Sequence, residues 1–104
     1  MVKEKTYSVY KHTFIEDDNK VYIGITSMPV EKRWRKGKGY RRRIRGKFTQ
    51  KAMAKAVAKW DWDTQITHEV LFTGLTKEEA KRIESELIQK YQSHLPEYGY
   101  NLAL

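Results

Sequence analysis

The sequence has no cysteine and only two prolines in 104 residues. The lack of cysteine excludes a disulfide framework and a cysteine-ligated zinc site. No apolar run approaches the roughly 18 residues needed to cross a bilayer, and residues 1–5 are mostly polar. We therefore expect a cytoplasmic protein that makes no use of a membrane. The length is typical of one small domain, so residues 1–104 are expected to form a single domain.

Acidic residues are absent from one long segment of the chain. Residues 32–59 include thirteen lysines or arginines and no aspartate or glutamate, whereas the rest of the chain has eight basic and thirteen acidic residues. The overall charge of +8 is thus concentrated in this basic segment. Such a density of positive charge favours a polyanion as partner. A solvated surface is the alternative, but aromatic and apolar residues interrupt the segment and indicate that part of it folds.

Two tyrosine-bearing segments near the start of the chain have the composition of β-strands. Residues 7–14 and 20–26 are rich in β-branched and aromatic residues, and the polar residues 17–20 between them are typical of a hairpin loop. An antiparallel pairing of these strands places Tyr10 and Tyr22 on neighbouring strands. A cap at Ser27 and the glycines at 37 and 39 predict a helix over residues 29–36, which carries Arg33.

The middle of the chain predicts a helix and a third strand. Residues 40–46 are expected to form an exposed loop that becomes ordered on DNA. Apolar residues at helical spacing predict a helix over residues 47–60, with lysines every fourth residue on another face. Residues 65–72 alternate and predict a strand, and residues 96–104 are expected to pack back on the domain. The fold class is therefore α+β, a small three-stranded antiparallel sheet flanked by helices.

The last predicted helix carries a charge on its apolar face. Thr76 and Glu79 form a capping box, and the following apolar residues share one stripe at helical spacing: Ala80, Ile83, Leu87, Ile88 and Tyr91. Glu84 lies within this stripe. Burying a carboxylate is costly unless a cation or a hydrogen-bond donor meets it. The sequence leaves two partners open: a divalent metal ion, or a basic side chain such as Arg33.

These residues resemble the motif of the GIY-YIG endonuclease family, in particular its compact homing- and phage-type members. Five elements match in the order of the family, over nearly the whole chain: Ser8-Val9-Tyr10, Tyr22-Ile23-Gly24, Arg33, Glu84 three residues before Leu87-Ile88, and Asn101 after Gly99-Tyr100. A single three-residue motif is weak, but five elements at compatible spacings are specific.

The resemblance implies a divalent-metal-dependent DNA endonuclease that hydrolyses phosphodiester bonds. It implies Mg²⁺ or Mn²⁺ held by Glu84, and Arg33 on the phosphate. Tyr10 is expected to take the proton from the attacking water, with Tyr22 hydrogen-bonded near it or sharing the role; two protonated phenols would instead orient the water and the phosphate. Asn101 is expected to fix the glutamate-bearing helix or a metal-bound water, or to have a purely structural role.

The chain departs from the family pattern at three places. Ser8 replaces the glycine of the first motif, a mild change because this position is mainly backbone. Gly37 stands where homing-type members often carry a histidine. Ile25 or Thr26 stands where some repair-type members have a lysine. Lys36, Lys38 and Tyr40 are candidates for the missing auxiliary acid–base group, whereas His12 and His68 are expected to be structural.

DNA is the expected partner, bound mainly through its phosphates and with little sequence preference. The residues expected on this surface are Arg35, Lys36, Lys38, Tyr40, Arg41, Arg42, Arg43, Arg45, Lys47 and Lys51. Trp62 or Tyr40 is a candidate for stacking on bases. Because one site cuts one strand at a time, we also expect either a DNA-targeting partner or a transient dimer on DNA.

Two other classes of protein are compatible with the composition. A non-catalytic nucleic-acid-binding domain would keep the nuclease fold and the basic face but cleave poorly. A small basic RNA-associated structural protein would explain the charge but not the glutamate on the apolar stripe. Metal-dependent cleavage separates the nuclease from both alternatives.

Overall fold

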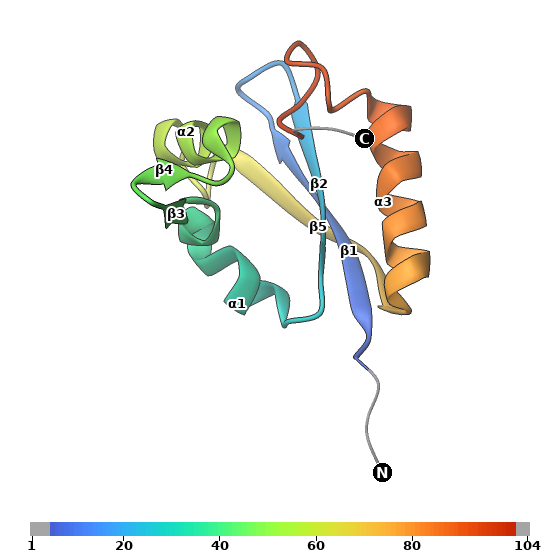
Figure 1. The fold of residues 1–104 in the computed structure, drawn as a ribbon. Helices are drawn as coiled ribbons and strands as arrows, with labels where there is room; N and C mark the ends of the chain where they lie inside the picture. Colours follow the sequence, from blue (N-terminus) through green and yellow to red (C-terminus); the bar gives the residue numbers. More distant parts are fainter. Residues whose placement is uncertain (1–4, 102–104) are drawn as a thin grey trace.

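The computed structural model describes residues 5–101 (Figure 1). Its elements in chain order are β1 (Tyr7–Phe14), β2 (Lys20–Thr26), α1 (Val30–Trp34), the 3₁₀ helix η1 (Arg35–Tyr40), β3 (Arg43–Ile44), β4 (Lys47–Phe48), α2 (Lys51–Lys59), β5 (Ile66–Leu75) and α3 (Lys77–Tyr91). The predicted α+β fold is confirmed, since a three-stranded antiparallel sheet lies between α3 and the other helices. No helix within these residues has the length and apolarity needed to cross a membrane.

Strand β1 is the centre of the sheet. It pairs antiparallel with β2 on one side and with β5 on the other. The register places Tyr10 opposite Gly24 and His12 opposite Tyr22. Side chains alternate along a strand and opposite residues share a face, so Tyr10, His12 and Tyr22 all project from the same face of the sheet. The predicted pairing of the first two strands is therefore confirmed.

Helix α3 covers the aliphatic face of the sheet. Val9, Val21 and Ile23 from β1 and β2 pack against Ala80 and Ile88 of the helix. The capping box predicted at its start is present, because the Thr76 hydroxyl accepts from the Glu79 backbone N–H and the Glu79 carboxylate accepts from the Thr76 N–H. The prediction for this helix is therefore confirmed. It was possible because the cap and the apolar stripe both depend on residues that are close in the sequence.

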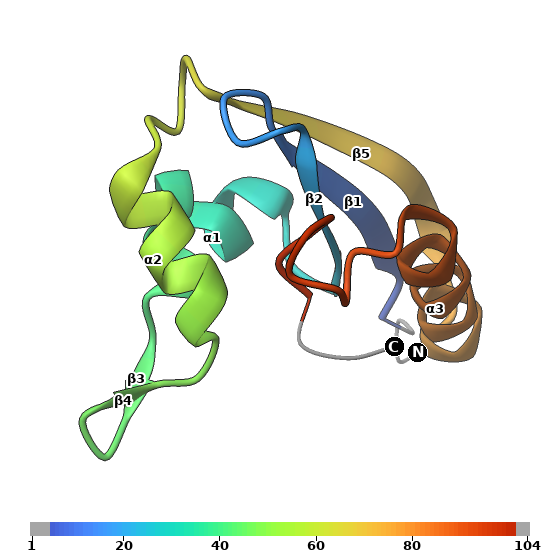
Figure 2. The ribbon, with the colours of Figure 1, turned by 90° about the horizontal axis from the view of Figure 1, so that it is seen from above.

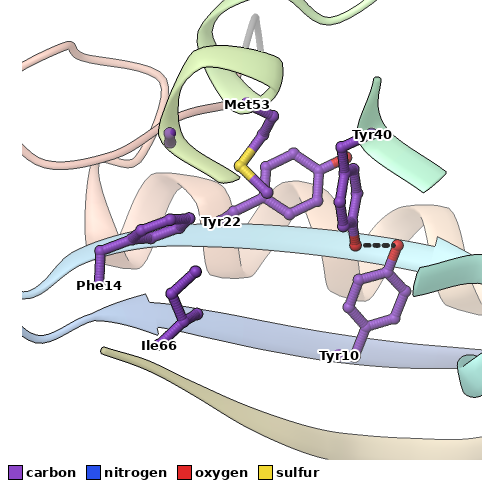
Figure 3. Close-up of a cluster of buried hydrophobic side chains, with 7 residues drawn as sticks. Tyr10, Phe14, Tyr22, Tyr40, Met53 and Ile66 are labelled. Atoms are coloured by element: carbon purple, nitrogen blue, oxygen red, sulfur yellow. Dashed lines mark hydrogen bonds between the residues drawn. The ribbon is translucent and has the colours of Figure 1, made fainter. Parts of the chain in front are cut away.

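The opposite face of the sheet carries an aromatic core (Figure 3). Its buried members are Tyr10, Phe14, Tyr22, Tyr40, Met53, Ala56 and Ile66, contributed by β1, β2, η1, α2 and β5. The three tryptophans, Trp34, Trp60 and Trp62, are partly buried and pack against this cluster. Both signature tyrosines thus lie in the more polar of the two cores.

The first helix is shorter than predicted. Helix α1 ends at Trp34 instead of residue 36, and the chain continues as η1 through Arg35, Lys36 and Gly37, which all have positive φ. The expected cap at Ser27 is wrong, since Pro29 occupies the N-cap position and no side chain caps the helix. Arg33 nevertheless lies on α1, as predicted.

The prediction of a loop over residues 40–46 is wrong in part, because β3 and the turn after it lie within this range and form a hairpin with β4. Strands β3 and β4 pair antiparallel, with Ile44 opposite Lys47. The two residues between them, Arg45 and Gly46, have φ of 53° and 79°, which suits the tight turn of a two-residue hairpin. The hairpin projects from the body of the molecule (Figure 2). Helix α2 consequently begins at Lys51 and not at residue 47.

The segment after α3 returns to the sheet. Val21 of β2 forms a parallel bridge with Gly99, and its backbone accepts from the Tyr100 N–H and donates to the Tyr98 carbonyl. The predicted packing of the tail is therefore confirmed for residues up to 101. Residues 102–104 lie outside the described part.

Replacing Gly24 with alanine is expected to destabilise the fold by about 1–3 kcal/mol. A Cβ at this position would lie 2.5 Å from the Tyr10 hydroxyl, and Tyr10 is fully buried. Thermal or urea unfolding measures the loss. Gly46→Ala is the control, because no atom lies within 4 Å of its Cβ position and only its positive φ matters. If Gly24→Ala were as stable as the wild type, the close approach of the Tyr10 ring to Gly24 would be contradicted.

Candidate active site

The two signature tyrosines lie deep in the aromatic core. Tyr10 is 0% exposed and Tyr22 is 8% exposed. Burial raises the pKa of both phenols above the ordinary value, and the nearby Arg33 charge lowers it only in part. Both phenols are therefore neutral near pH 7. The Tyr22 hydroxyl donates to the Gln50 side-chain oxygen at 2.9 Å, which ties β2 to the residue before α2.

Arg33 reaches this pair of phenols from α1. Its guanidinium lies 4.6 Å from the centre of the Tyr40 ring and donates to the Gly39 carbonyl at 2.9 Å. Gly39 permits this approach because a Cβ there would overlap the Arg33 carbonyl. The guanidinium lowers the pKa of Tyr10 as well, opposing the effect of burial. The structure thus brings together the arginine and both tyrosines, as the strand and helix predictions implied.

Tyr40 belongs to the core and not to the outer surface. It is 1% exposed, and its hydroxyl oxygen lies 3.1 Å from that of Tyr10 (Figure 3). The same oxygen lies 2.7 Å from Nε2 of His12. The expectation that Tyr40 lies on the nucleic-acid surface or stacks on bases is therefore corrected, because its ring is covered. A tyrosine after two closely spaced glycines gave no local signal of burial.

Glu84 is the carboxylate that the sequence predicts at the site. It is half-buried on α3, and burial raises its pKa while Lys81 lowers it. Its charge raises the pKa of both Tyr10 and Tyr22, so it lies within electrostatic range of the two phenols. Within residues 5–101 it forms no ion pair, and no group of three or more His, Cys, Asp and Glu residues is present. The basic side chain considered as its partner is therefore not paired with it.

Two histidines expected to be structural extend the polar network. His12 is fully buried, and its Nδ1 lies 2.9 Å from Nδ1 of His68 on β5. Nε2 of His68 lies 2.9 Å from the Trp62 carbonyl oxygen. Sequence reasoning placed both on strands but had no means to pair them, because residues 12 and 68 are 56 positions apart.

Asn101 connects the tail to β2 and to the end of α3. Its side-chain oxygen accepts from the Ile23 N–H at 3.0 Å and from the Ser93 hydroxyl at 2.7 Å, and its amide nitrogen donates to the Ile23 carbonyl at 2.8 Å. The side chain is thus fully used in holding β2 against the tail. These contacts fit both a purely structural role and the fixing of the glutamate-bearing helix, and the role of Asn101 stays a prediction.

An open, basic pocket lies beside the phenols. Its volume is about 390 Å³, and it is lined by Met28, Lys32, Arg33, Arg35, Gly39, Arg42, Thr49 and Gln50. Four of these residues are cations and none is acidic. Gln50, which accepts from Tyr22, connects the pocket to the aromatic core. A phosphate group is the anion that such a set of guanidinium and ammonium groups recognises.

The remaining basic residues of the predicted surface are solvent-exposed. Apart from Tyr40, every member of that set is exposed: Arg35, Lys36, Lys38, Arg41, Arg42, Arg43, Arg45, Lys47 and Lys51. Several of them lie on the projecting hairpin (Figure 2). Ile44, near its tip, is 54% exposed. The hairpin and the pocket therefore form one extended positive surface next to the tyrosines.

Comparison with protein families identifies the class of this site. The model of the GIY-YIG catalytic domain matches residues 6–101, which is nearly the whole chain. The chain therefore belongs to the GIY-YIG family, a family of nuclease domains. No curated protein and no solved structure matches the chain.

Gly37, which stands where the family resemblance led us to expect a histidine, has surroundings that oppose a side chain. It is buried with φ of 95°, and a Cβ there would lie 3.1 Å from the Trp62 ring and 3.2 Å from Cβ of Val57. A side chain at this position is thus opposed by both the backbone conformation and the packing. Lys36 and Lys38, two of the three candidates for the missing group, are exposed. Tyr40, the third, contacts Tyr10 directly.

Replacing Asn101 with alanine is expected to lower stability by about 1–3 kcal/mol, because the Ile23 backbone groups lose their partners. Chemical denaturation measures the loss, and Gln89→Ala, at an exposed position of α3, is the control. If Asn101→Ala kept full stability and lost only activity, Asn101 would instead have a chemical role.

Proposed function

We propose that this protein is a divalent-metal-dependent DNA endonuclease that hydrolyses phosphodiester bonds with little intrinsic sequence specificity. The observation that carries the proposal is the Arg33 guanidinium next to two buried phenols and a basic pocket, with the half-buried Glu84 carboxylate within electrostatic range of both phenols and in no ion pair within the described residues. Phosphodiester hydrolysis needs an activated water, stabilisation of charge on the phosphoryl oxygens and help for the leaving oxygen. The residues gathered here have the chemistry for the first two.

Glu84 fits a magnesium or manganese ion. A half-buried carboxylate with a raised pKa and no ion pair within the described residues gains from a nearby cation, which favours its charged form. Mg²⁺ is commonly bound by one or two carboxylates together with waters and substrate phosphate. Zinc sites usually need three or more protein ligands, and the described residues hold no such group. A bound Mg²⁺ or Mn²⁺ would supply positive charge to the phosphoryl and leaving oxygens.

Arg33 and its neighbours in the pocket would bind the phosphate. A guanidinium recognises phosphate through two parallel N–H donors, and its charge offsets the negative charge that develops during attack. Arg33 also lies over Tyr40 and close to Tyr10, so a phosphate bound to the guanidinium would lie near the phenols. Tyr10 then accepts a proton from the water, and Tyr22 lies beside it.

The extended basic surface supports DNA as the substrate. Contacts from the hairpin and the pocket would reach phosphates, which carry no sequence information. Cleavage of both strands would require a transient dimer on DNA or a DNA-targeting partner. A cytoplasmic location stays a prediction.

One observation favours a second candidate function. Tyr10 is fully buried in the free protein, which suits a nucleic-acid-binding domain that keeps the nuclease fold without cleaving. Hydrogen bonds in free enzymes often reach their catalytic geometry only with substrate, so burial alone does not decide between the two. Metal-dependent cleavage does.

Plasmid nicking with Mg²⁺ or Mn²⁺ tests the nuclease. The wild type is expected to convert supercoiled DNA to nicked circles, EDTA to abolish this, and Glu84→Ala to reduce it at least 100-fold. Glu86→Ala is the matched control, since Glu86 is exposed on the same helix and faces Arg82. Retardation of the plasmid without nicking would instead support the binding domain, and nicking by Glu84→Ala at the wild-type rate would remove Glu84 from the site.

The pH dependence of nicking is expected to have an acid limb from Glu84. Its pKa is raised by burial, so the carboxylate keeps its proton at a higher pH than an ordinary glutamate. Activity that needs the charged form is therefore full above the raised pKa and is lost as the pH falls through it. Rates at limiting metal measure this limb, because a saturating cation would itself hold the carboxylate charged and move the limb to lower pH. An acid limb at or below the ordinary glutamate pKa of about 4.3 would contradict the buried placement.

Binding to duplex DNA is expected to weaken steeply with salt. Arg42→Ala in the pocket and Lys47→Ala on the hairpin should each reduce the slope of log K against log salt by about 1. Arg82→Ala is the control, since Arg82 is exposed on α3 across the sheet. Fluorescence anisotropy at several salt concentrations measures the slopes. If the slope of log K against log salt were the same for all three variants, the DNA would not bind at the pocket and the hairpin.

A further inference from the structure

Four side chains form a continuous hydrogen-bonded chain through the aromatic core. The Tyr10 and Tyr40 hydroxyl oxygens are 3.1 Å apart, and the Tyr40 oxygen is 2.7 Å from Nε2 of His12. Nδ1 of His12 is 2.9 Å from Nδ1 of His68, and Nε2 of His68 is 2.9 Å from the Trp62 carbonyl oxygen. The chain thus starts at the proposed catalytic phenol and ends at a backbone carbonyl.

The carbonyl at the end fixes the direction of every bond. A carbonyl only accepts, so Nε2 of His68 carries a proton, and in a neutral imidazole Nδ1 is then an acceptor. Nδ1 of His12 must therefore donate to it, which leaves Nε2 of His12 as an acceptor. Tyr40 has a single hydroxyl proton and donates it there.

The direction in which the Tyr10 hydroxyl donates follows from the same count of protons. The distance of 3.1 Å between the two hydroxyls permits donation in either direction, but the Tyr40 proton is used on His12, so the Tyr40 oxygen accepts from Tyr10. The Tyr10 proton thus points into the core, and the Tyr10 oxygen accepts from the Arg33 side chain and has a second lone pair for another donor. An attacking water is the donor that the proposed reaction supplies.

Burial keeps both imidazoles neutral, as the count requires. The pKa of His12 is well below its usual value because of burial, with the His68 and Arg33 charges adding to the effect. Burial lowers the pKa of His68 too, whereas the Trp62 carbonyl and the Asp63 carboxylate raise it. His68 is only half-buried and is therefore the better of the two places for a positive charge.

We propose that Tyr10, Tyr40, His12 and His68 form a proton relay that activates the attacking water, and that His68 holds the resulting positive charge. This inference rests on the proposed nuclease function. It assigns an auxiliary base to a chain whose Gly37 leaves no room for the histidine of homing-type relatives. In this relay Tyr10 contacts the reacting water, whereas Tyr40, His12 and His68 act through Tyr10.

The relay balances in protons and bonds. The water gives a proton to the Tyr10 oxygen, Tyr10 passes its own proton to Tyr40, and Tyr40 passes its proton to Nε2 of His12. Nδ1 of His12 then gives its proton to Nδ1 of His68, which becomes the imidazolium. The hydroxide forms a bond to phosphorus, the bond to the 3′ oxygen breaks, and that oxygen takes a proton from solvent. After the product leaves, the chain runs in reverse and Tyr10 returns the proton to bulk water.

The tautomers test the relay without any need for activity. Imidazole ¹⁵N–¹H correlation spectra of the full chain at neutral pH are expected to show the proton of His68 on Nε2 and that of His12 on Nδ1. The opposite tautomer on either residue would overturn the direction of the chain. Tyr40→Phe is expected to remove the hydrogen bond to His12 and to change the Nε2 shift of His12.

Amide substitutions separate a relay from a structural role. Glutamine can keep hydrogen bonds at either histidine but cannot accept and pass a proton, so His12→Gln and His68→Gln should slow single-turnover nicking about 100-fold. Both variants are expected to bind plasmid as the wild type does. His94→Gln, the same change at a histidine outside the network, should nick at the wild-type rate.

The pH profile gives a readout that a structural role would not move. A protonated His68 cannot accept a proton, so the wild-type rate should fall with acidification through a pKa below about 6.5, the ordinary histidine value. This step should be absent from both glutamine variants, while the limb from Glu84 is kept. The groups that face the network are Arg33 from α1, Glu84 from α3 and Asp63 before β5.

Each result bears on a different proposal. If both glutamine variants fold, bind DNA and nick at the wild-type rate with an unchanged pH profile, the relay is wrong and the nuclease stands. If the wild type does not nick DNA, the proposed function fails and the relay fails with it as a catalytic device. Loss of rate and of the histidine step, with binding retained, supports both.

Discussion

The hydroxyl of Tyr10 is a polar atom inside a fully buried aromatic layer, and much of the site follows from its need for a partner. Tyr40 meets that need, which fixes η1 over the sheet. The Tyr40 ring in turn carries the Arg33 guanidinium on its face, and Gly39 accepts from the same group. Gly24 leaves the space in which the Tyr10 ring lies. The Tyr10 hydroxyl thus connects strand β1 to Tyr40, and Tyr40 in turn contacts Arg33.

Charge is divided across the molecule in a way that suits a phosphodiester substrate. Cations line the pocket and the hairpin, whereas Glu84 approaches the phenols from α3 on the other side. Between them, Tyr10 and Tyr22 are neutral because burial raises the pKa of each. A neutral phenol is a weak base, and this is the problem that a path to an imidazole solves. In the proposed function, the positive surface would hold the DNA and the buried network would determine where a proton can go.

The proposed relay places an imidazole at a different position from the one that the family resemblance led us to expect. The position of the family histidine is occupied by Gly37, which is packed against Trp62 and has a left-handed backbone. His12 and His68 lie near the same tryptophan but come from two strands of the sheet. The His12 and His68 imidazoles therefore lie behind Tyr10, the proposed catalytic tyrosine, and not on the helix of Arg33. The family match alone does not reveal this substitution.

The sequence by itself determined the pairing of β1 with β2, the helix that carries Arg33, the capped helix α3 with Glu84 on its apolar stripe, and the family. These depend on signals within a few residues, such as alternation, caps and motif spacing. Only the tertiary structure decided that Tyr40 is buried, that residues 43–48 form a hairpin, and that His12 and His68 meet. His12 is 28 positions from Tyr40 and 56 from His68. Their contacts depend on strand register and on how η1 folds over the sheet, which no local pattern encodes.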